Sequence, residues 1–164
     1  MIVVSDTTPL RHLIAIGKVD LLRTLYGAVT VPAAVWQELQ AESTPARVKT
    51  WLSSAPDWLA VRSPGRPEAD TSMLDDLDCG EREAILLATE LHADLLLIDD
   101  REARAVALRL QLPVTGTLWV CSKELRLPVC SWTCRGCSEI WKRVVSICLH
   151  GCGRLFWSGI GAVR

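Results

Sequence analysis

The sequence lacks any run of 18 apolar residues, which is about the length that a helix needs to cross a membrane. Its first residues, MIVVSDTTPL, lack the basic and long apolar stretches of a signal peptide. Neither a GxGxxG nor a Walker A motif is present, which argues against nucleotide-cofactor enzymes. No G-x-S-x-G elbow accompanies the three histidines, so a serine hydrolase is disfavoured. We therefore expect a cytoplasmic protein with no membrane partner.

Positive charge is scarce in the first part of the chain, and negative charge is scarce in the last. Residues 1–118 contain 11 Lys and Arg against 17 Asp and Glu, whereas residues 119–164 contain seven against two. Six of the seven cysteines and four of the seven tryptophans also lie in the second part. A chain of 164 residues is long enough to bury a core. We predict one domain over residues 1–118 and an atypical Cys- and Trp-rich tail over residues 119–164.

Short apolar runs alternate with helical patterns throughout the first part. The expected strands are residues 2–5, 29–31, 59–61, 95–98 and 113–115. The expected helices are residues 9–16, 19–26, 32–39, 45–52, 81–91 and 103–110. This alternation predicts an α/β fold with a mostly parallel sheet covered on both faces.

Acidic residues fall where the expected strands give way to helices, or near helix ends: Asp6, Glu38, Glu81, Glu83, Asp99 and Asp100. The carboxyl ends of parallel strands meet at one edge of a sheet, so residues that follow these strands should lie close together. Clustered carboxylates repel one another unless a cation neutralises them. Oxygen ligands without His or Cys suit Mg²⁺ or Mn²⁺. The set therefore indicates metal-dependent phosphodiester hydrolysis.

Each of these acidic residues also has a purely structural interpretation. Asp6 and Asp100 can cap the helices that follow them, and Glu81 can complete a capping box. Glu83 lies in a first helical turn, where the helix dipole favours a carboxylate. Glu38 can be a solvated helix residue. The functional hypothesis rests on the whole set and its order along the chain.

Four segments in order carry a resemblance to a known family. They are VVSDTTPL around Asp6, VPAAVWQEL around Glu38, GEREAI at residues 80–85 and LLLIDDREAR at residues 95–104. Over about residues 1–118 this pattern resembles PIN-domain proteins, which include the VapC-type toxins and related PIN-like nucleic-acid-binding proteins. The resemblance implies a three-layer α/β/α sandwich around a mostly parallel central sheet.

The resemblance also implies an activity, which is that of a Mg²⁺- or Mn²⁺-dependent endoribonuclease and the toxin half of a toxin–antitoxin pair. The implied metal-binding and catalytic carboxylates, with two positions left open, are Asp6, Glu38, Glu81 or Glu83, and Asp99 or Asp100. Thr7 is implied to orient the site through its hydroxyl. The implied partners are an RNA substrate, an antitoxin protein and a second copy of the chain in a homodimer.

The tail departs from this family pattern and has three explanations. Its cysteines form C-x₃-C-x₂-C at residues 130–137 and C-x-H-x-C at residues 148–152, of which only Cys134 and Cys137 have the common zinc-site interval. A disulfide framework conflicts with a cytoplasmic setting. No sustained amphipathic repeat runs through residues 119–164, as expected if a frameshift replaced the original tail. A genuine but undistinguished tail is the third explanation, and resequencing the 3′ region of the gene separates these cases.

Two other functions compete with the nuclease hypothesis. Dehalogenase-like phosphatases also place an Asp after the first strand, but they require a second Asp two residues later, where this chain has Thr8. The non-enzymatic alternative is a PIN-like module that binds nucleic acid without cleaving it, or a pseudoenzyme damaged in its tail. Metal-dependent RNA cleavage that disappears in Asp6→Asn separates the enzyme from the binding module.

Overall fold

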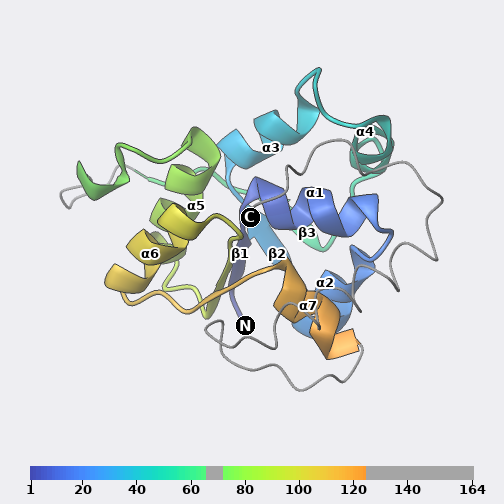
Figure 1. The fold of residues 1–164 in the computed structure, drawn as a ribbon. Coiled ribbons are helices and arrows are strands. Elements are labelled where there is room, and N and C mark those ends of the chain that lie inside the picture. Colours follow the sequence, from blue (N-terminus) through green and yellow to red (C-terminus); the bar gives the residue numbers. More distant parts are fainter. Residues whose placement is uncertain (66–71, 125–164) are drawn as a thin grey trace, which may run out of the picture.

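The computed structural model describes residues 1–65 and 72–124, in which short strands alternate with helices (Figure 1). The predictions for the tail from residue 125 onward, including its cysteine patterns and the frameshift, lie outside the described residues. The strands are β1 (Val3–Ser5), β2 (Val29–Val31), β3 (Leu59–Val61), β4 (Leu95–Leu97) and β5 (Val114–Thr115). The helices are α1 (Thr7–Ala15), α2 (Asp20–Tyr26), α3 (Ala33–Gln40), α4 (Ala46–Leu52), α5 (Cys79–Glu90), α6 (Arg101–Arg109) and α7 (Thr117–Glu124), with a 3₁₀ turn η1 (Ser72–Leu74).

The five strands form one sheet in the order β3-β2-β1-β4-β5, and every described pairing is parallel. Val4, in the central strand β1, pairs with Thr30 of β2 on one side and with Leu96 of β4 on the other. Parallel neighbours require a crossover, and the helices between the strands supply it. The predicted α/β fold with a mostly parallel sheet is confirmed.

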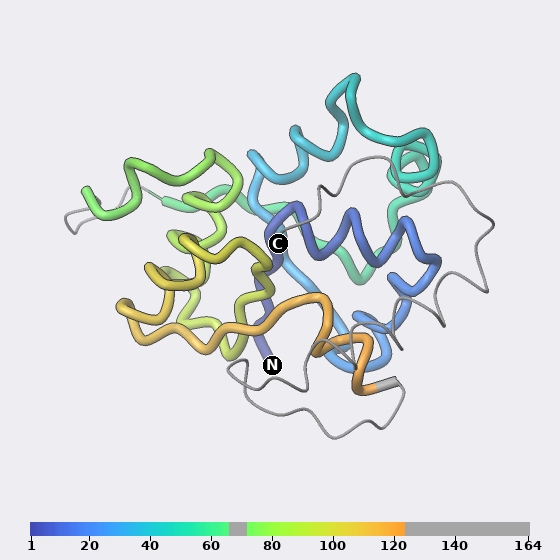
Figure 2. The backbone as a smooth tube through the Cα atoms, viewed as in Figure 1, coloured from blue at the N-terminus to red at the C-terminus, as the bar shows by residue number. Residues whose placement is uncertain are grey.

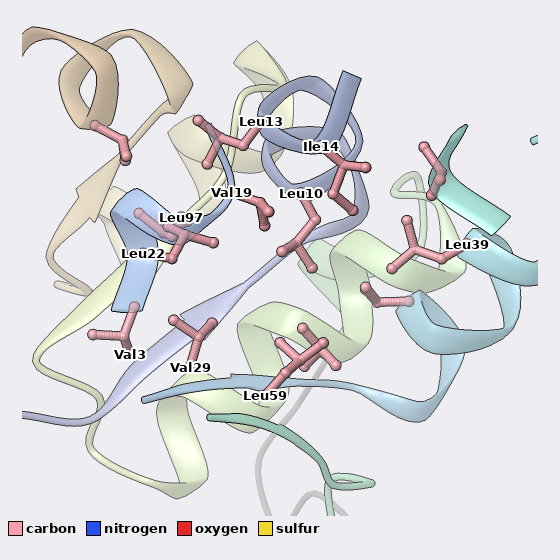
Figure 3. Packing of buried hydrophobic residues seen from close by; sticks show 14 of the residues in the cluster. Val3, Leu10, Leu13, Ile14, Val19, Leu22, Val29, Leu39, Leu59 and Leu97 are labelled. Atoms are coloured by element: carbon pink, nitrogen blue, oxygen red, sulfur yellow. The ribbon is translucent and has the colours of Figure 1, made fainter. Parts of the chain in front are cut away.

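Two hydrophobic cores lie on opposite faces of the sheet. Val3 and Leu97 point into the first core, where they meet apolar side chains of α1, α2, α3, α4 and α7 (Figure 3). Val4 and Leu96 point into the second core, which α5 and α6 cover. Because successive strand residues face opposite sides, near-continuous apolar strands are what a sheet buried on both faces requires. The predicted three-layer arrangement is confirmed.

Two helices begin two residues earlier than their apolar patterns predict. The sequence pattern places the start of α1 at Pro9, but the helix begins at Thr7 because the Asp6 carboxylate accepts a hydrogen bond from Thr8 N at 3.3 Å. In the same way α6 begins at Arg101, since Asp100 caps it. A side-chain cap satisfies backbone N–H groups that otherwise lack a partner, and so extends the helix toward it.

Helix α7 continues the packed part of the chain past residue 118. It lies against α1 and α2 (Figure 2), and its residues Val120 and Cys121 are buried in the first core. The compositional change at Trp119 therefore lies inside this helix. No helix within residues 1–65 and 72–124 is long and apolar enough to cross a membrane.

Candidate functional site

The candidate site begins at the carboxyl ends of the two adjacent strands β1 and β4. From β1 the sheet extends to β2 and β3 on one side and to β4 and β5 on the other, so the strand order reverses between β1 and β4. Asp6 follows β1 directly, and its N–H donates to the Leu97 carbonyl of β4 at 2.9 Å. Asp99 comes two residues after Leu97. Both carboxylates thus flank the position where open parallel sheets bind ligands.

Asp6 is a buried acid among other acids. It is 2% exposed, and burial raises its pKa to about 6. The negative charges of Glu38 and Asp99 raise the pKa further, while hydrogen bonds from the Thr7 and Thr8 backbone N–H groups lower it. The direction follows from physics, because desolvation and like charges both disfavour the ionised form. Asp6 is therefore the centre of an uncompensated negative field.

Glu38, in α3, joins two other elements through its carboxylate. The Thr7 hydroxyl donates to Oε2, and the Gly80 N–H donates to Oε1 at 2.8 Å. Thr7 follows Asp6, and Gly80 precedes Glu81. A Cβ on residue 80 would lie 2.6 Å from Oε1 and 2.7 Å from Oε2 of Glu38, which is closer than side-chain contacts allow. The carboxylate can dock here because residue 80 is glycine.

Glu81 and Asp100 lie on the α5–α6 side of the site. Burial raises the pKa of Glu81 to about 7, and the charges of Asp100 and Asp6 add to the increase. Its Oε2 also accepts a long hydrogen bond of 3.4 Å from Asp78 N, the glutamate half of a capping box. Asp100 accepts from Glu102 N at 2.7 Å and Ala103 N at 2.9 Å with a single oxygen, Oδ1. Each residue combines a helix-end contact with proximity to the acidic centre.

Asp99 is the acid that is best supplied with hydrogen-bond donors. Thr117 N donates to Oδ1 at 2.8 Å, Thr117 Oγ1 donates to Oδ2 at 2.5 Å, and His12 Nδ1 lies 3.4 Å from Oδ2. Burial raises the pKa of Asp99, but the hydrogen bonds from His12 and Thr117 outweigh it, and the pKa is lowered. Asp99 is therefore ionised more readily than Asp6.

Three residues near Asp99 were not predicted from the sequence, namely His12, Arg104 and Thr117. Arg104 donates from Nη1 to the Ile98 carbonyl at 3.0 Å. Burial lowers its pKa, and the charge of Asp99 opposes that shift. Arg104 belongs to the LLLIDDREAR segment, which offered a signal for it. His12 carried none, because an exposed histidine on an amphipathic helix is ordinary.

Glu83 lies apart from these acids in its contacts. Its Oε2 accepts a hydrogen bond from Ala34 N at 3.0 Å, at the N-terminus of α3. Pro32, which precedes that helix, provides no side-chain cap. Because Glu38 of α3 accepts from Gly80 near the N-terminus of α5, the two helices cap each other. Of the predicted acids, the structure gathers the following around Asp6: Glu38, Glu81, Asp99 and Asp100.

The donor set matches a hard divalent cation in chemistry and in charge. Carboxylate oxygens are the preferred ligands of Mg²⁺ and Mn²⁺, and the raised pKa values of Asp6 and Glu81 reflect negative charge that a cation would neutralise. The described residues nevertheless contain no group of three or more His, Cys, Asp or Glu side chains arranged as metal ligands. The Glu38 and Asp99 carboxylates are directed at protein donors instead, and a bound cation would share them with those donors.

Comparison with known proteins gives one family match. No curated protein matches the chain. Similar solved structures include a PilT N-terminus domain protein, SSO1118, from Sulfolobus solfataricus P2, which is 17% identical, with a TM-score of 0.48 over 80% of this chain and 99% of that one. The family described as DUF3368, PIN domain, matches residues 2–129, which is most of the chain. The chain belongs to this PIN-domain family.

Proposed function

We propose that the protein is a Mg²⁺- or Mn²⁺-dependent endoribonuclease that hydrolyses RNA phosphodiester bonds. One observation carries the proposal: in a chain of the PIN-domain family, acids from four separate segments surround the buried Asp6 at the switch point of the sheet. Packing several carboxylates around a buried one is destabilising without a cation. Such an arrangement is typical of a site whose ligand is positively charged.

The acids divide into two groups by how well protein donors compensate them. Asp6 and Glu81, whose pKa values are raised, are the principal ligands in this proposal, and Asp99 and Asp100 complete the site. When bound, Mg²⁺ or Mn²⁺ lowers the pKa of a coordinated water and neutralises charge that develops on the phosphate. His12 is exposed and lies beside Asp99, so it is placed to contact a phosphate of the substrate.

The proposed biological role is that of the toxin in a toxin–antitoxin pair. The support is the resemblance of the motifs around Asp6 and Glu38 to those of VapC-type toxins, together with membership of the PIN-domain family. The partners proposed on this basis are an antitoxin protein and a second copy of the chain. Co-purification from cells that co-express the neighbouring gene would test the first partner, and light scattering of the purified protein would test the second.

The decisive experiment is RNA cleavage by the full chain and by Asp6→Asn. A set of structured and single-stranded RNAs is incubated with Mn²⁺, and the products are separated on a denaturing gel. We expect cleavage by the wild type, none by Asp6→Asn, and none by the wild type in EDTA until Mn²⁺ or Mg²⁺ is restored. Asp20→Asn, which removes an exposed carboxylate from α2, is the matched control and should cleave normally. Equal cleavage by Asp6→Asn would exclude the proposed site.

A binding module without catalysis is the second candidate, and one observation favours it. No three acids within residues 1–65 and 72–124 are already gathered as metal ligands. Fluorescence anisotropy with labelled RNA distinguishes this candidate. A binding module would bind RNA with equal affinity in EDTA and in Mn²⁺ and would leave it intact, with affinity falling steeply as salt increases.

A further inference from the structure

The carboxylate of Glu38 lies between two residues that adjoin the two least compensated acids of the site. Its Oε2 accepts from the hydroxyl of Thr7, the residue after Asp6. Its Oε1 accepts from the N–H of Gly80, the residue before Glu81, at 2.8 Å. The backbone of Glu38 is also fixed, because the Thr44 hydroxyl donates to its carbonyl at 3.1 Å.

We propose that Glu38 is a positioning residue, whose carboxylate bridges Thr7 and Gly80 and thereby fixes the separation of Asp6 and Glu81. The inference rests on the proposed function, because it assigns these two acids to a cation. It changes the role of Glu38 from a direct ligand to a residue that acts through its two neighbours. Partners that orient metal ligands commonly affect metal affinity about 10- to 100-fold when they are removed.

Gly80 is part of the same device, and its substitution offers a clean test. A methyl group at residue 80 meets only the end of the flexible Glu38 side chain, with the nearest carboxylate atoms 2.6 to 2.9 Å away. Gly80→Ala therefore displaces the carboxylate, while the helix itself gains because alanine is the better helix former. Any loss of cation binding then traces to the bridge and not to unfolding.

Glu38→Gln separates a bridge from a ligand. The glutamine carbonyl can accept from Gly80 N, and its amide N–H can donate to the Thr7 hydroxyl, so the bridge survives without its charge. A direct ligand to a divalent cation needs that charge. Rescue by the amide is therefore a result that the bridging role predicts and the ligand role does not.

The experiment measures Mn²⁺ affinity by isothermal titration calorimetry on the full chain. The variants are Gly80→Ala, Glu38→Ala, Glu38→Gln and Asp6→Asn, with Asp20→Asn as the control. We expect Gly80→Ala and Glu38→Ala to lower the affinity about 10- to 100-fold, Glu38→Gln to stay close to the wild type, and Asp6→Asn to lose the most. If Glu38→Gln loses as much as Asp6→Asn, or if folded Gly80→Ala binds like the wild type, the bridging role is wrong.

A second measurement without any metal distinguishes this inference from the proposed function. Side-chain carboxyl ¹³C resonances of Asp6 and Glu81 report their surroundings directly. We expect both to shift in Gly80→Ala and in Glu38→Ala, and neither to shift in Asp20→Asn. If the wild type binds no Mn²⁺, the proposed cation site fails by itself. Unshifted resonances in folded Gly80→Ala would then overturn the bridge independently.

Discussion

At the scale of single residues, Asp6 illustrates a conflict between folding and function. Its carboxylate caps α1 through Thr8 N, which favours the charged form, but it is 2% exposed and surrounded by acids, which disfavour that form. Burial is the largest cause, and the pKa rises to about 6. A group held in this way destabilises the fold at neutral pH and is retained where a ligand needs it.

This conflict predicts that Asp6→Asn is more stable than the wild type at neutral pH. The folded pKa of about 6 exceeds the ordinary value of 3.8, so the folded state binds the proton more tightly and its free energy of unfolding falls as the pH rises from about 4 to about 6. Asparagine still caps the helix but carries no charge. We expect a gain of up to about 3 kcal/mol above this window, and none near pH 4.

Urea unfolding of the metal-free proteins between pH 4 and pH 8 measures this difference. The Asp20→Asn variant should track the wild type across the range, since its carboxylate is exposed. A variant at Asp6 that is less stable than the wild type at pH 8 would contradict the assigned burial cost.

At the scale of elements, α3 and α5 are tied by two carboxylates that run in opposite directions. Glu83 of α5 accepts from Ala34 N in α3, and Glu38 of α3 accepts from Gly80 N in α5. Each contact satisfies an N–H in a first helical turn, which has no partner within its own helix. The pair therefore sets how the two helices meet, and with it where Glu38 and Glu81 lie.

We expect Glu83→Ala to lower the free energy of unfolding by about 1 kcal/mol, the usual effect of losing a helix cap. Glu83→Gln keeps an oxygen acceptor and should lose less. Urea midpoints give the energies, and hydrogen exchange of the Ala34 amide should be faster in the alanine variant than in the glutamine variant. Equal exchange in both would show that the Glu83 contact does not protect that amide.

The sequence predicts strands and helix interiors better than helix ends. Apolar runs at residues 29–31 and 95–98 can only be strands buried on both faces, and the structure confirms both. The starts of α1 and α6 depend on the side chains of Asp6 and Asp100, which lie outside the apolar periodicity. Caps are local chemistry that a hydrophobic pattern does not contain.

The site could be predicted only as far as the parallel-strand rule reaches. That rule places Asp6 and Asp99 at the same sheet edge, as observed. The bond between Glu38 and Gly80 joins residues 42 positions apart and is decided by how two helices pack. Glu81 and Glu83 point about 200° apart around one helix axis, and sequence alone offers no means of choosing between them. Their roles as ligands stay predictions.

At the scale of the whole molecule, a cation that binds only the folded state stabilises it by mass action. The effect is about 2.7 kcal/mol when the free cation is at a hundred times its dissociation constant. We expect the melting temperature of the wild type to rise with Mn²⁺ concentration and that of Asp6→Asn to remain constant. Differential scanning calorimetry measures both, with NaCl at matched ionic strength as the control. Equal rises in the two proteins would indicate cation binding elsewhere.

The order of the strands has a consequence for the chain as it leaves the ribosome. Val4 pairs with Leu96, so about 90 residues must be synthesised before β1 meets β4. At typical translation rates of 5–20 residues per second this takes roughly 5 to 18 s. Asp99 and its donor Thr117 are translated later still. The acids that gather around Asp6 thus stay apart during most of synthesis, and the nascent protein has no assembled site while it is bound to the ribosome's RNA.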